Sequence, residues 1–251
     1  MTSWATKRKT VLVIVLVSLI IAFGVLLAIP FVYKVPSCMD GKQNQDESGI
    51  DCGGGCARIC AVEASAPNVR FARTLSQLGR TDVIAYVDNR NQNAYAKDAQ
   101  YTVEVYDENR TLIGKQTGVV DLAPSVTTPL FISGIPTGAR TAVQAFVSFE
   151  AGDVEWYQYD GKVQMPTVRE AKLQDGVLPR IIAVLENQTP RPFLNTEAVV
   201  TVFDSFNNAI AASKTVVRTV PASGTAEAIF TWPAPFASPA VRVEVLTVPV
   251  P

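Results

Sequence analysis

The sequence predicts an all-β ectodomain, made of two tandem β-sandwiches that follow one N-terminal transmembrane helix and a short disulfide-rich segment. Three observations predict it: an uncharged apolar run near the N-terminus, four cysteines confined to one segment, and a body that repeats itself at an offset of about 98 residues. The expected boundaries are residues 11–33 for the helix, 36–62 for the cysteine-rich segment, and 66–162 and 163–251 for the two sandwiches.

A run of uncharged and almost entirely apolar residues extends from Thr10 to Tyr33. A helix needs roughly 20 such residues to cross the hydrocarbon core of a bilayer, so the lipid bilayer is the first expected partner. A cleaved signal peptide is the alternative, with Ala22-Phe23-Gly24 as a small-residue cleavage site. Because apolar residues continue through Val25–Val32, the run is too long for a signal-peptide core, and we expect a permanent signal-anchor.

Basic residues indicate the orientation of this helix. Lys7, Arg8 and Lys9 stand directly before it. The positive-inside rule therefore places residues 1–10 in the cytoplasm as a short stub and the C-terminal body on the extracytoplasmic side of the cell membrane. Three of the 22 basic residues lie before Tyr33, which leaves 19 basic against 23 acidic residues for the rest of the chain. This acidic balance argues against a nucleic acid partner.

Histidine is absent from the sequence. Its absence excludes Ser-His-Asp and Cys-His catalysis, histidine-ligated zinc and histidine proton shuttles. The carboxylates, lysines and tyrosines show no constellation typical of a catalytic site. The sequence therefore predicts that the protein is not an enzyme.

All four cysteines lie within residues 36–62, at Cys38, Cys52, Cys56 and Cys60. Outside the membrane the default for such a cluster is two disulfides, and three connectivities are open. A zinc site of four thiolates fits the spacing less well, since two CxxC pairs are missing. The bridges would stabilise a segment that has few other ways to hold a shape.

Oxygen-bearing side chains follow the pattern D-G-x2-N-x2-E-x3-D between the first two cysteines. The candidate metal ligands are Asp40, Asn44, Asp46, Glu47 and Asp51. Calcium takes about six to eight oxygen ligands, and the neighbouring glycines let the backbone curl. Calcium is thus one expectation for this loop, and a solvated turn between disulfides is the other.

The block C-M-D-G-K-Q-N-Q-D-E-S-G-I-D-C-G-G-G-C-A-R-I-C resembles a small cysteine-rich module of surface proteins, which reads C-x-D-G-x2-N-x2-E-x3-D-C-G-G-x-C-x2-C. The resemblance covers about a tenth of the chain. This chain departs from the module at the end, where three residues instead of two separate Cys56 from Cys60. This change in spacing affects the expected bridge at the last cysteine more than it affects the acidic loop.

The body beyond residue 65 lacks helical periodicity and alternates β-branched and aromatic residues between turn-forming ones. It also aligns with itself: Val83–Asn89 matches Ile181–Asn187, and Val103–Asp107 matches Val200–Asp204. A period of this length is too long for a solenoid repeat and fits one sandwich domain. Each sandwich should have roughly seven strands, with the linker near Gly161–Glu170.

Alternation also predicts which side chains face between the sheets, because successive side chains of a strand point to opposite faces. The matching positions should face inward in the second copy. The inward residues expected in the first copy are Val83, Ala85, Val87, Val103, Val105, Val143, Ala145 and Val147.

The recurring strand–turn–strand, VEVYDENRTLIG and VTVFDSFNNAIA, resembles the FxLYD-type domain. In each copy a preceding strand ends in Asn, at Asn89 and Asn187, and a Pro/Ser-containing loop follows. The turn glycine of that family is missing, and Arg110 and Asn208 occupy its region. The resemblance implies two immunoglobulin-like extracytoplasmic modules, often found on bacterial membrane-anchored proteins and without an agreed catalytic activity.

Three aromatic residues near the end of the first sandwich, Trp156, Tyr157 and Tyr159, are candidate binding residues for a carbohydrate or a protein. The alternative, which we favour, is packing at the joint between the two sandwiches, since aromatic residues dominate cores as well as interfaces.

Two other polar features do not by themselves indicate a functional site. Asp107 and Asp204 end strands before turns, and their recurrence in both copies favours an Asx-type turn cap over a metal ligand. Asn109 and Asn187 each begin a glycosylation sequon, which matters only in a host that glycosylates this compartment.

The sequence as a whole predicts a single-pass, membrane-anchored, extracytoplasmic module, structural or protein-binding, with a protein partner in the envelope or at the cell surface. A ligand- or carbohydrate-binding receptor subunit is one alternative, and it predicts that Trp156 or Trp232 is exposed. An accessory subunit of a membrane enzyme or transport complex is another. An enzymatic role predicts a polar cleft with converging carboxylates or lysines.

Overall fold

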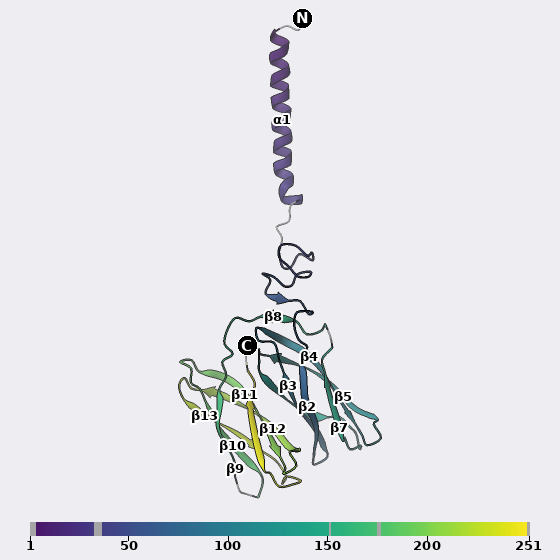
Figure 1. The fold of residues 1–251 in the computed structure, drawn as a ribbon, viewed down its shortest axis with the longest axis vertical. Coiled ribbons are helices and arrows are strands. Elements are labelled where there is room, and N and C mark those ends of the chain that lie inside the picture. The colour runs from purple at the N-terminus through teal and green to yellow at the C-terminus, as the bar shows by residue number, and fades with distance from the viewer. Residues whose placement is uncertain (1–3, 33–36, 151, 175–176, 250–251) are drawn as a thin grey trace.

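The computed structural model describes residues 4–32, 37–150, 152–174 and 177–249. Within these ranges the chain forms one helix and fourteen strands, so the fold beyond the helix is all-β, as the sequence predicts. Figure 1 shows helix α1 at one end of the molecule, with the cysteine-rich segment between it and the body of strands.

Helix α1 (Trp4–Val32) includes much of the predicted cytoplasmic stub as well as the apolar run. The stub contains no glycine or proline that would stop a helix. Within α1, the span Lys7–Ala28 contains an 18-residue window with a mean hydropathy of 3.3 and is long and apolar enough to cross a membrane. Tyr33, the last residue of the predicted span, lies outside the described residues.

The first part of the body has two antiparallel sheets. One has the order β2-β3-β6, formed by Asn68–Gln77, Arg80–Asp88 and Thr127–Ile135. The other has the order β1-β8-β4-β5, with β7 also paired to β4. In chain order its strands are β1 (Arg58–Ile59), β4 (Ala94–Tyr106), β5 (Leu112–Leu122), β7 (Gln144–Ser148) and β8 (Trp156–Gln158).

The second part repeats this arrangement with two three-stranded sheets. One has the order β13-β10-β9, formed by Thr225–Thr231, Arg180–Glu186 and Thr167–Gln174. The other has the order β12-β11-β14, formed by Ala209–Val220, Phe193–Phe203 and Arg242–Thr247. Strands β9–β14 therefore take the places of β2–β7 one by one. We term β2–β7 unit 1 and β9–β14 unit 2. With β8, the predicted first sandwich (residues 66–162) contains seven strands, as expected, and the predicted second sandwich (163–251) contains six.

Each unit has a hydrophobic core between its two sheets. The core of unit 1 contains seven of the eight predicted inward residues: Val83, Ala85, Val87, Val103, Val105, Ala145 and Val147. The matching core of unit 2 contains Ile181, Ala183, Leu185, Val200, Val202 and Val245. These positions confirm the alternation expected from the sequence.

Val143 and its counterpart Val241 are the exceptions, and the prediction that they face inward is wrong. Their exposed fractions are 56% and 67%. Each lies one residue before its strand begins, and its backbone N–H donates to the carbonyl oxygen of Tyr106 or Phe203 on the neighbouring strand. The alternation of side chains holds only inside the regular strand, so it does not extend to these residues.

The two turns that follow β4 and β11 are Asx-type turns. Asp204 accepts hydrogen bonds from the backbone N–H groups of Asn208 and Phe206, both at 2.9 Å, and Asp107 makes the same pair of bonds in unit 1. The bond from the Asn208 N–H holds the pKa of Asp204 below its ordinary value. A residue with positive φ completes each turn, at Arg110 and Asn207.

The linker before unit 2 ends earlier than the sequence predicted. Strand β9 already begins at Thr167, so the last residues of the expected linker are strand. The hydroxyl of Thr247 donates to the carbonyl oxygen of Pro166 at 2.9 Å, which ties the chain entering β9 to the end of β14.

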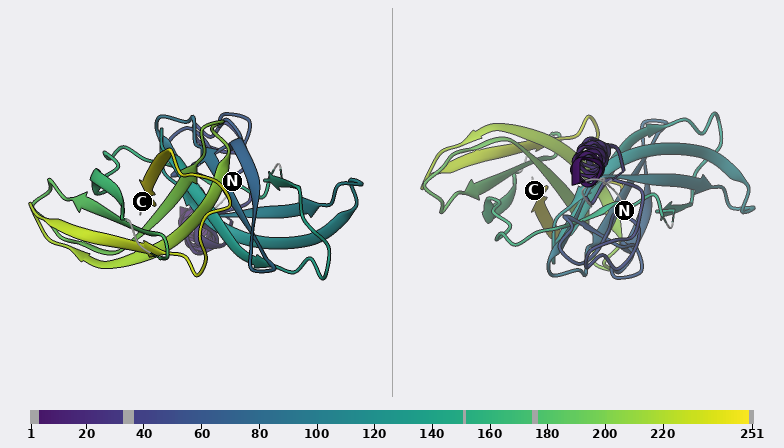
Figure 2. Two further views of the ribbon diagram at one scale, coloured as in Figure 1. Left: turned by 90° about the horizontal axis from the view of Figure 1, so that it is seen from below. Right: turned by 90° about the horizontal axis from the view of Figure 1, so that it is seen from above.

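The two units pack side by side, with one sheet of each facing the other (Figures 1 and 2). Strands β3 and β11 are consequently buried on both faces, over residues 81–87 and 198–203. One face contributes to the unit's own core. The other joins a third apolar cluster that combines Leu75, Ile84 and Tyr86 of unit 1 with Val199 and Ala212 of unit 2.

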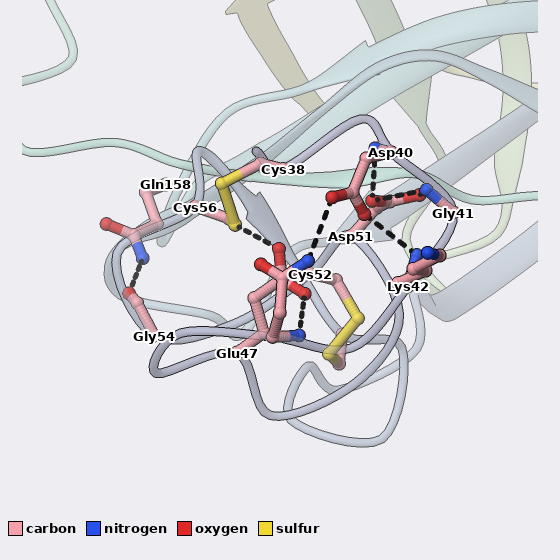
Figure 3. Close-up of a disulfide and its surroundings, with 12 residues drawn as sticks. Cys38, Asp40, Gly41, Lys42, Glu47, Asp51, Cys52, Gly54, Cys56 and Gln158 are labelled. Carbon is pink, nitrogen blue, oxygen red and sulfur yellow. Dashed lines mark hydrogen bonds between the residues drawn. A yellow bond between two sulfur atoms is a disulfide. The ribbon is translucent and has the colours of Figure 1, made fainter. Parts of the chain in front are cut away.

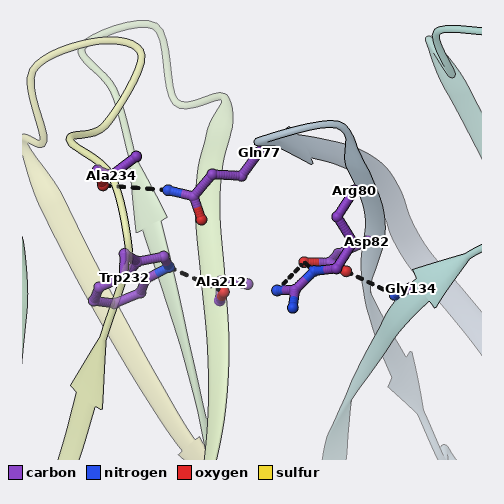
Figure 4. A network of polar contacts seen from close by, with 7 residues as sticks. All are labelled: Gln77, Arg80, Asp82, Gly134, Ala212, Trp232 and Ala234. Carbon is purple, nitrogen blue, oxygen red and sulfur yellow. Dashed lines mark hydrogen bonds and ion pairs between the residues drawn. The ribbon is translucent and has the colours of Figure 1, made fainter.

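Polar contacts near the β2–β3 turn add to this interface (Figure 4). Gln77 of unit 1 donates to the carbonyl oxygen of Ala234 of unit 2 at 3.2 Å. The buried carboxylate of Asp82 accepts hydrogen bonds from the Arg80 guanidinium and from the backbone N–H of Gly134. Asp82 is therefore satisfied at the edge of the interface, as a buried charge must be.

Candidate functional site

Two disulfides hold the cysteine-rich segment, residues 37–65, which we term the collar (Figure 3). Cys38 is bonded to Cys56 and Cys52 to Cys60. This pairing confirms the disulfide prediction and selects one of the three open connectivities. All four cysteines are consumed, so no thiolate remains to bind zinc.

The carboxylates of Asp51 and Asp40 bind the collar's own backbone (Figure 3). Asp51 accepts hydrogen bonds from the backbone N–H groups of Asp40 at 2.9 Å and of Gly41 at 3.0 Å. Asp40 accepts hydrogen bonds from the backbone N–H of Lys42 and the side-chain amide of Asn44. Desolvation raises the pKa of Asp40, but these hydrogen bonds outweigh it and hold the pKa below its ordinary value.

Glu47 lies buried against the Cys38–Cys56 disulfide. One carboxylate oxygen accepts a hydrogen bond from the backbone N–H of Asn44 at 3.1 Å, and the other lies 3.3 Å from Cys56 Sγ. A disulfide sulfur carries no proton, so the second approach is a contact and not a hydrogen bond. In the described chain, Cys38, Glu47 and Cys56 are the one group of three potential metal ligands whose ligand atoms lie within 4.8 Å of one another. Two bonded sulfurs are not thiolate ligands, so this set is not a metal site.

The predicted calcium ligands do not form a calcium cage as they are arranged. Asp40, Glu47 and Asp51 bond to separate backbone N–H groups, and no three acidic residues of the described collar bring oxygens within 4.8 Å of one another. Asn44 Oδ1 is buried without a hydrogen-bond partner, but one amide oxygen is far from the six to eight that calcium takes. Calcium binding stays a prediction that requires the carboxylates, Asp46 included, to turn toward an ion.

Strand β8 joins the collar to unit 1, and it places the predicted aromatic residues. It pairs with β1 of the collar and with β4 of unit 1. Trp156 is 3% exposed and belongs to the core of unit 1. The half-buried rings of Tyr157 and Tyr159 lie 5.5 and 5.8 Å from the ring of Tyr95. The three predicted residues thus pack at the joint of collar and unit 1, not between the two units.

A groove that no sequence pattern had indicated lies between the units, and we term it the inter-unit groove. It is a cavity of about 280 Å³. Its lining consists of three aromatic residues (Phe71, Tyr86 and Phe203), three arginines (Arg70, Arg73 and Arg242), and Asn207, Ala209 and Glu244. The rings of Phe71 and Tyr86 lie 4.6 Å apart. The Arg242 guanidinium lies 3.6 Å from the centre of the Phe203 ring, a cation–π contact.

The three arginines of the groove differ in their partners. Arg70 donates to the carboxylate of Asp88 at 2.8 and 3.2 Å. Arg242 donates to Glu244 at 2.8 Å. The exposed Arg73 forms no ion pair with any described residue and donates to the carbonyl oxygen of its neighbour Ala72 at 3.0 Å. The groove therefore carries a positive charge that no acid of the described chain neutralises.

The internal repeat contains a signal for Arg73 that alternation alone does not reveal. Residues 69–73 read VRFAR, and the matching residues 168–172 in unit 2 read VREAK. In unit 2, Lys172 pairs with Glu170. In unit 1, Phe71 stands at the place of that acid, so Arg73 lacks the acidic partner that Lys172 has.

No protein-family model matches the chain, and no curated protein sequence matches it. Among solved structures, it is similar to the transglutaminase of red sea bream, with 14% sequence identity and a TM-score of 0.24 over 73% of this chain. The match spans 31% of the transglutaminase chain. A likeness at this score carries no argument about fold or activity.

Proposed function

We propose that this chain is a single-pass, membrane-anchored, extracytoplasmic module that is structural or binds other proteins and catalyses no reaction. In this proposal α1 is the anchor, and residues 1–10 are its cytoplasmic stub. The basic residues before the apolar run support that orientation. Units 1 and 2 are immunoglobulin-like sandwiches of the FxLYD type, a proposal supported by their shared order of six antiparallel strands.

The observation that carries the proposal is that the collar is bonded to unit 1 and unit 1 is packed against unit 2. Strand β8 bonds the collar to unit 1, and Gln158 adds bonds to the collar carbonyl oxygens of Ala57 at 2.7 Å and Gly54 at 3.2 Å. Unit 1 in turn shares an apolar cluster and the buried Tyr86–Thr201 hydrogen bond with unit 2. A body attached in this way holds its binding surfaces in a fixed position relative to the collar.

The carbohydrate-binding alternative receives no support from the tryptophans that it invoked. It required Trp156 or Trp232 to be exposed, and their exposed fractions are 3% and 4%. The basic inter-unit groove favours a protein partner instead. An accessory role in a membrane enzyme or transport complex is one form of protein binding, and the identity of the partner would reveal it.

The test is cross-linking of the full chain in intact native cells, followed by identification of the captured protein. The control chain keeps residues 1–65 and carries an unrelated β-sandwich in place of the body. We expect a discrete partner that only the native body captures. Equal capture by both chains contradicts the proposal, and so does a mature protein that begins at residue 25 and has left the membrane.

A further inference from the structure

The inter-unit groove continues along the free edges of two strands. A second hollow, of about 580 Å³, is lined by residues 143–147 of the β7 region and by five residues of β2: Val69, Phe71, Ala72, Arg73 and Thr74. It shares Phe71 and Arg73 with the inter-unit groove. Among the described strands, β2 pairs with β3 alone and β7 with β4 alone. Each therefore offers an unpaired edge, the kind of surface on which extended peptides bind.

The charges that line the two hollows favour an acidic ligand. Three arginines line them against a single acid, Glu244. Since Arg70 and Arg242 already have acidic partners, Arg73 is the guanidinium available for a new bond. A guanidinium can donate two parallel hydrogen bonds to one carboxylate, which is stronger than its present bond to a neutral carbonyl oxygen.

Apolar side chains beside Arg73 supply the rest of the surface. Val143 and Phe146 are 56% and 51% exposed where they line the second hollow. Phe71, which is half-buried, lies between this hollow and the inter-unit groove. An occupant with apolar side chains as well as acids would remove this area from water.

We propose that β2, β7 and the inter-unit groove bind an extended acidic segment of a partner protein. A carboxylate of the segment replaces the Ala72 carbonyl oxygen as the acceptor of the Arg73 guanidinium. The apolar residues of the segment cover Val143 and Phe146. This inference rests on the proposed function, and it names the surface and the kind of partner.

The test measures binding of a fluorescein-labelled peptide of alternating glutamate and valine to the full chain in detergent micelles, by fluorescence anisotropy. Arg73→Gln should weaken binding about tenfold, because a charge-assisted bond is lost at an exposed position that the fold does not need. Lys172→Gln is the matched control, since Lys172 occupies the same place in unit 2 but lines neither hollow. It should leave the affinity unchanged. A lysine–valine peptide should not bind.

Free glutamate and citrate distinguish a peptide from a small anion. If they compete as well as the unlabelled peptide does at equal carboxylate concentration, the groove binds small anions and the peptide proposal is wrong. It is also wrong if Arg73→Gln binds like the wild type, or if the wild type does not bind at millimolar peptide. If one of these results is obtained and a partner is still captured in cells, the proposed binding surface is wrong but the proposed function stands.

Discussion

Two buried asparagines, Asn89 in unit 1 and Asn187 in unit 2, hold the chain where β3 and β10 end. The side-chain amide of Asn89 donates to the carbonyl oxygens of Ala94 at 2.8 Å and Leu122 at 3.1 Å, and it accepts from the backbone N–H of Asn91. Asn187 makes the same kinds of bond at the matching place. The amide supplies donors to carbonyl oxygens at strand ends, those of Ala94 and Leu122 in unit 1 and of Val220 in unit 2.

Replacement of either asparagine by alanine should lower the free energy of unfolding by about 2–4 kcal/mol, because buried carbonyl oxygens lose their donors. Urea unfolding of the full chain in micelles, followed by tryptophan fluorescence, measures the change. Asn109→Ala, in an exposed turn, is the control and should cost less than about 0.5 kcal/mol. Losses below about 1 kcal/mol at both buried sites would show that the bonds contribute little.

The burial of Asn187 also distinguishes the two glycosylation sequons. A glycan attaches to the side-chain amide nitrogen, and that nitrogen of Asn187 is bonded to three carbonyl oxygens in a residue that is 1% exposed. Asn109 is exposed. In a glycosylating host we expect a single glycan, removed by Asn109→Gln and unaffected by Thr189→Ala, as read by the mass of the protein. A glycan that survives Asn109→Gln would contradict the burial of Asn187.

Among the elements, β8 has the largest role for its length, because its three residues bond to both the collar and unit 1. The collar itself depends on its bridges. Cys56 and Cys60 are its buried apolar side chains, and both belong to disulfides. The Cys38–Cys56 bridge joins residues 18 positions apart in the sequence. A bridge over such a loop contributes about 3 kcal/mol to stability by restricting the unfolded chain.

Removal of the Cys38–Cys56 bridge should therefore loosen the collar without unfolding the two units, whose cores it does not enter. Limited proteolysis of the Cys38→Ser/Cys56→Ser double variant should cut within residues 38–60 and release intact units 1 and 2. The oxidised wild type, treated in parallel, should resist cleavage there. If the units are digested at the same rate as the collar, the collar and the body unfold as one.

Sequence patterns predict these elements as far as the physical signals are local or repeated. Alternation and the repeat predicted the strands, most inward residues and the Asx turns, and they failed at Val143, one residue beyond a strand. The partner of each cysteine depends on the path of the chain, so the pairing stayed open. The contact between units is equally non-local, although the unbroken apolar run Val83–Val87 is typical of a strand buried on both faces.

At the scale of the whole molecule, the arrangement of the two units decides which surfaces a partner can reach. Units joined end to end would leave the outer faces of β3 and β11 exposed. Here those faces meet, so Ile84 and Val199 are buried and the inter-unit groove forms along the border of the contact. The groove thus depends on both units, and any change that separates them should abolish it.

Tyr86 determines how this contact responds to alkaline pH. Burial raises the pKa of Tyr86 to about 12, above the ordinary tyrosine value of about 10. The interface therefore favours the neutral phenol, whose hydroxyl donates to Thr201 at 2.9 Å. This stabilisation is complete below the ordinary pKa and is lost as the pH rises from about 10 through about 12. We expect the two units to separate in that window.

Spin labels on cysteines introduced at the exposed Thr117 of unit 1 and Glu227 of unit 2 would measure the separation, since all native cysteines are in disulfides. The distance between the labels should increase above pH 10 in the wild-type background. Tyr86→Phe keeps the ring but cannot ionise, so its distance should stay constant over the same range, at the cost of about 1 kcal/mol for the lost hydrogen bond. Tyr106→Phe, which removes a tyrosine whose pKa is raised by its hydrogen bond to Glu104 within unit 1, is the control and should behave like the wild type. An equal opening of the Tyr86→Phe variant would place the alkaline sensitivity in another group.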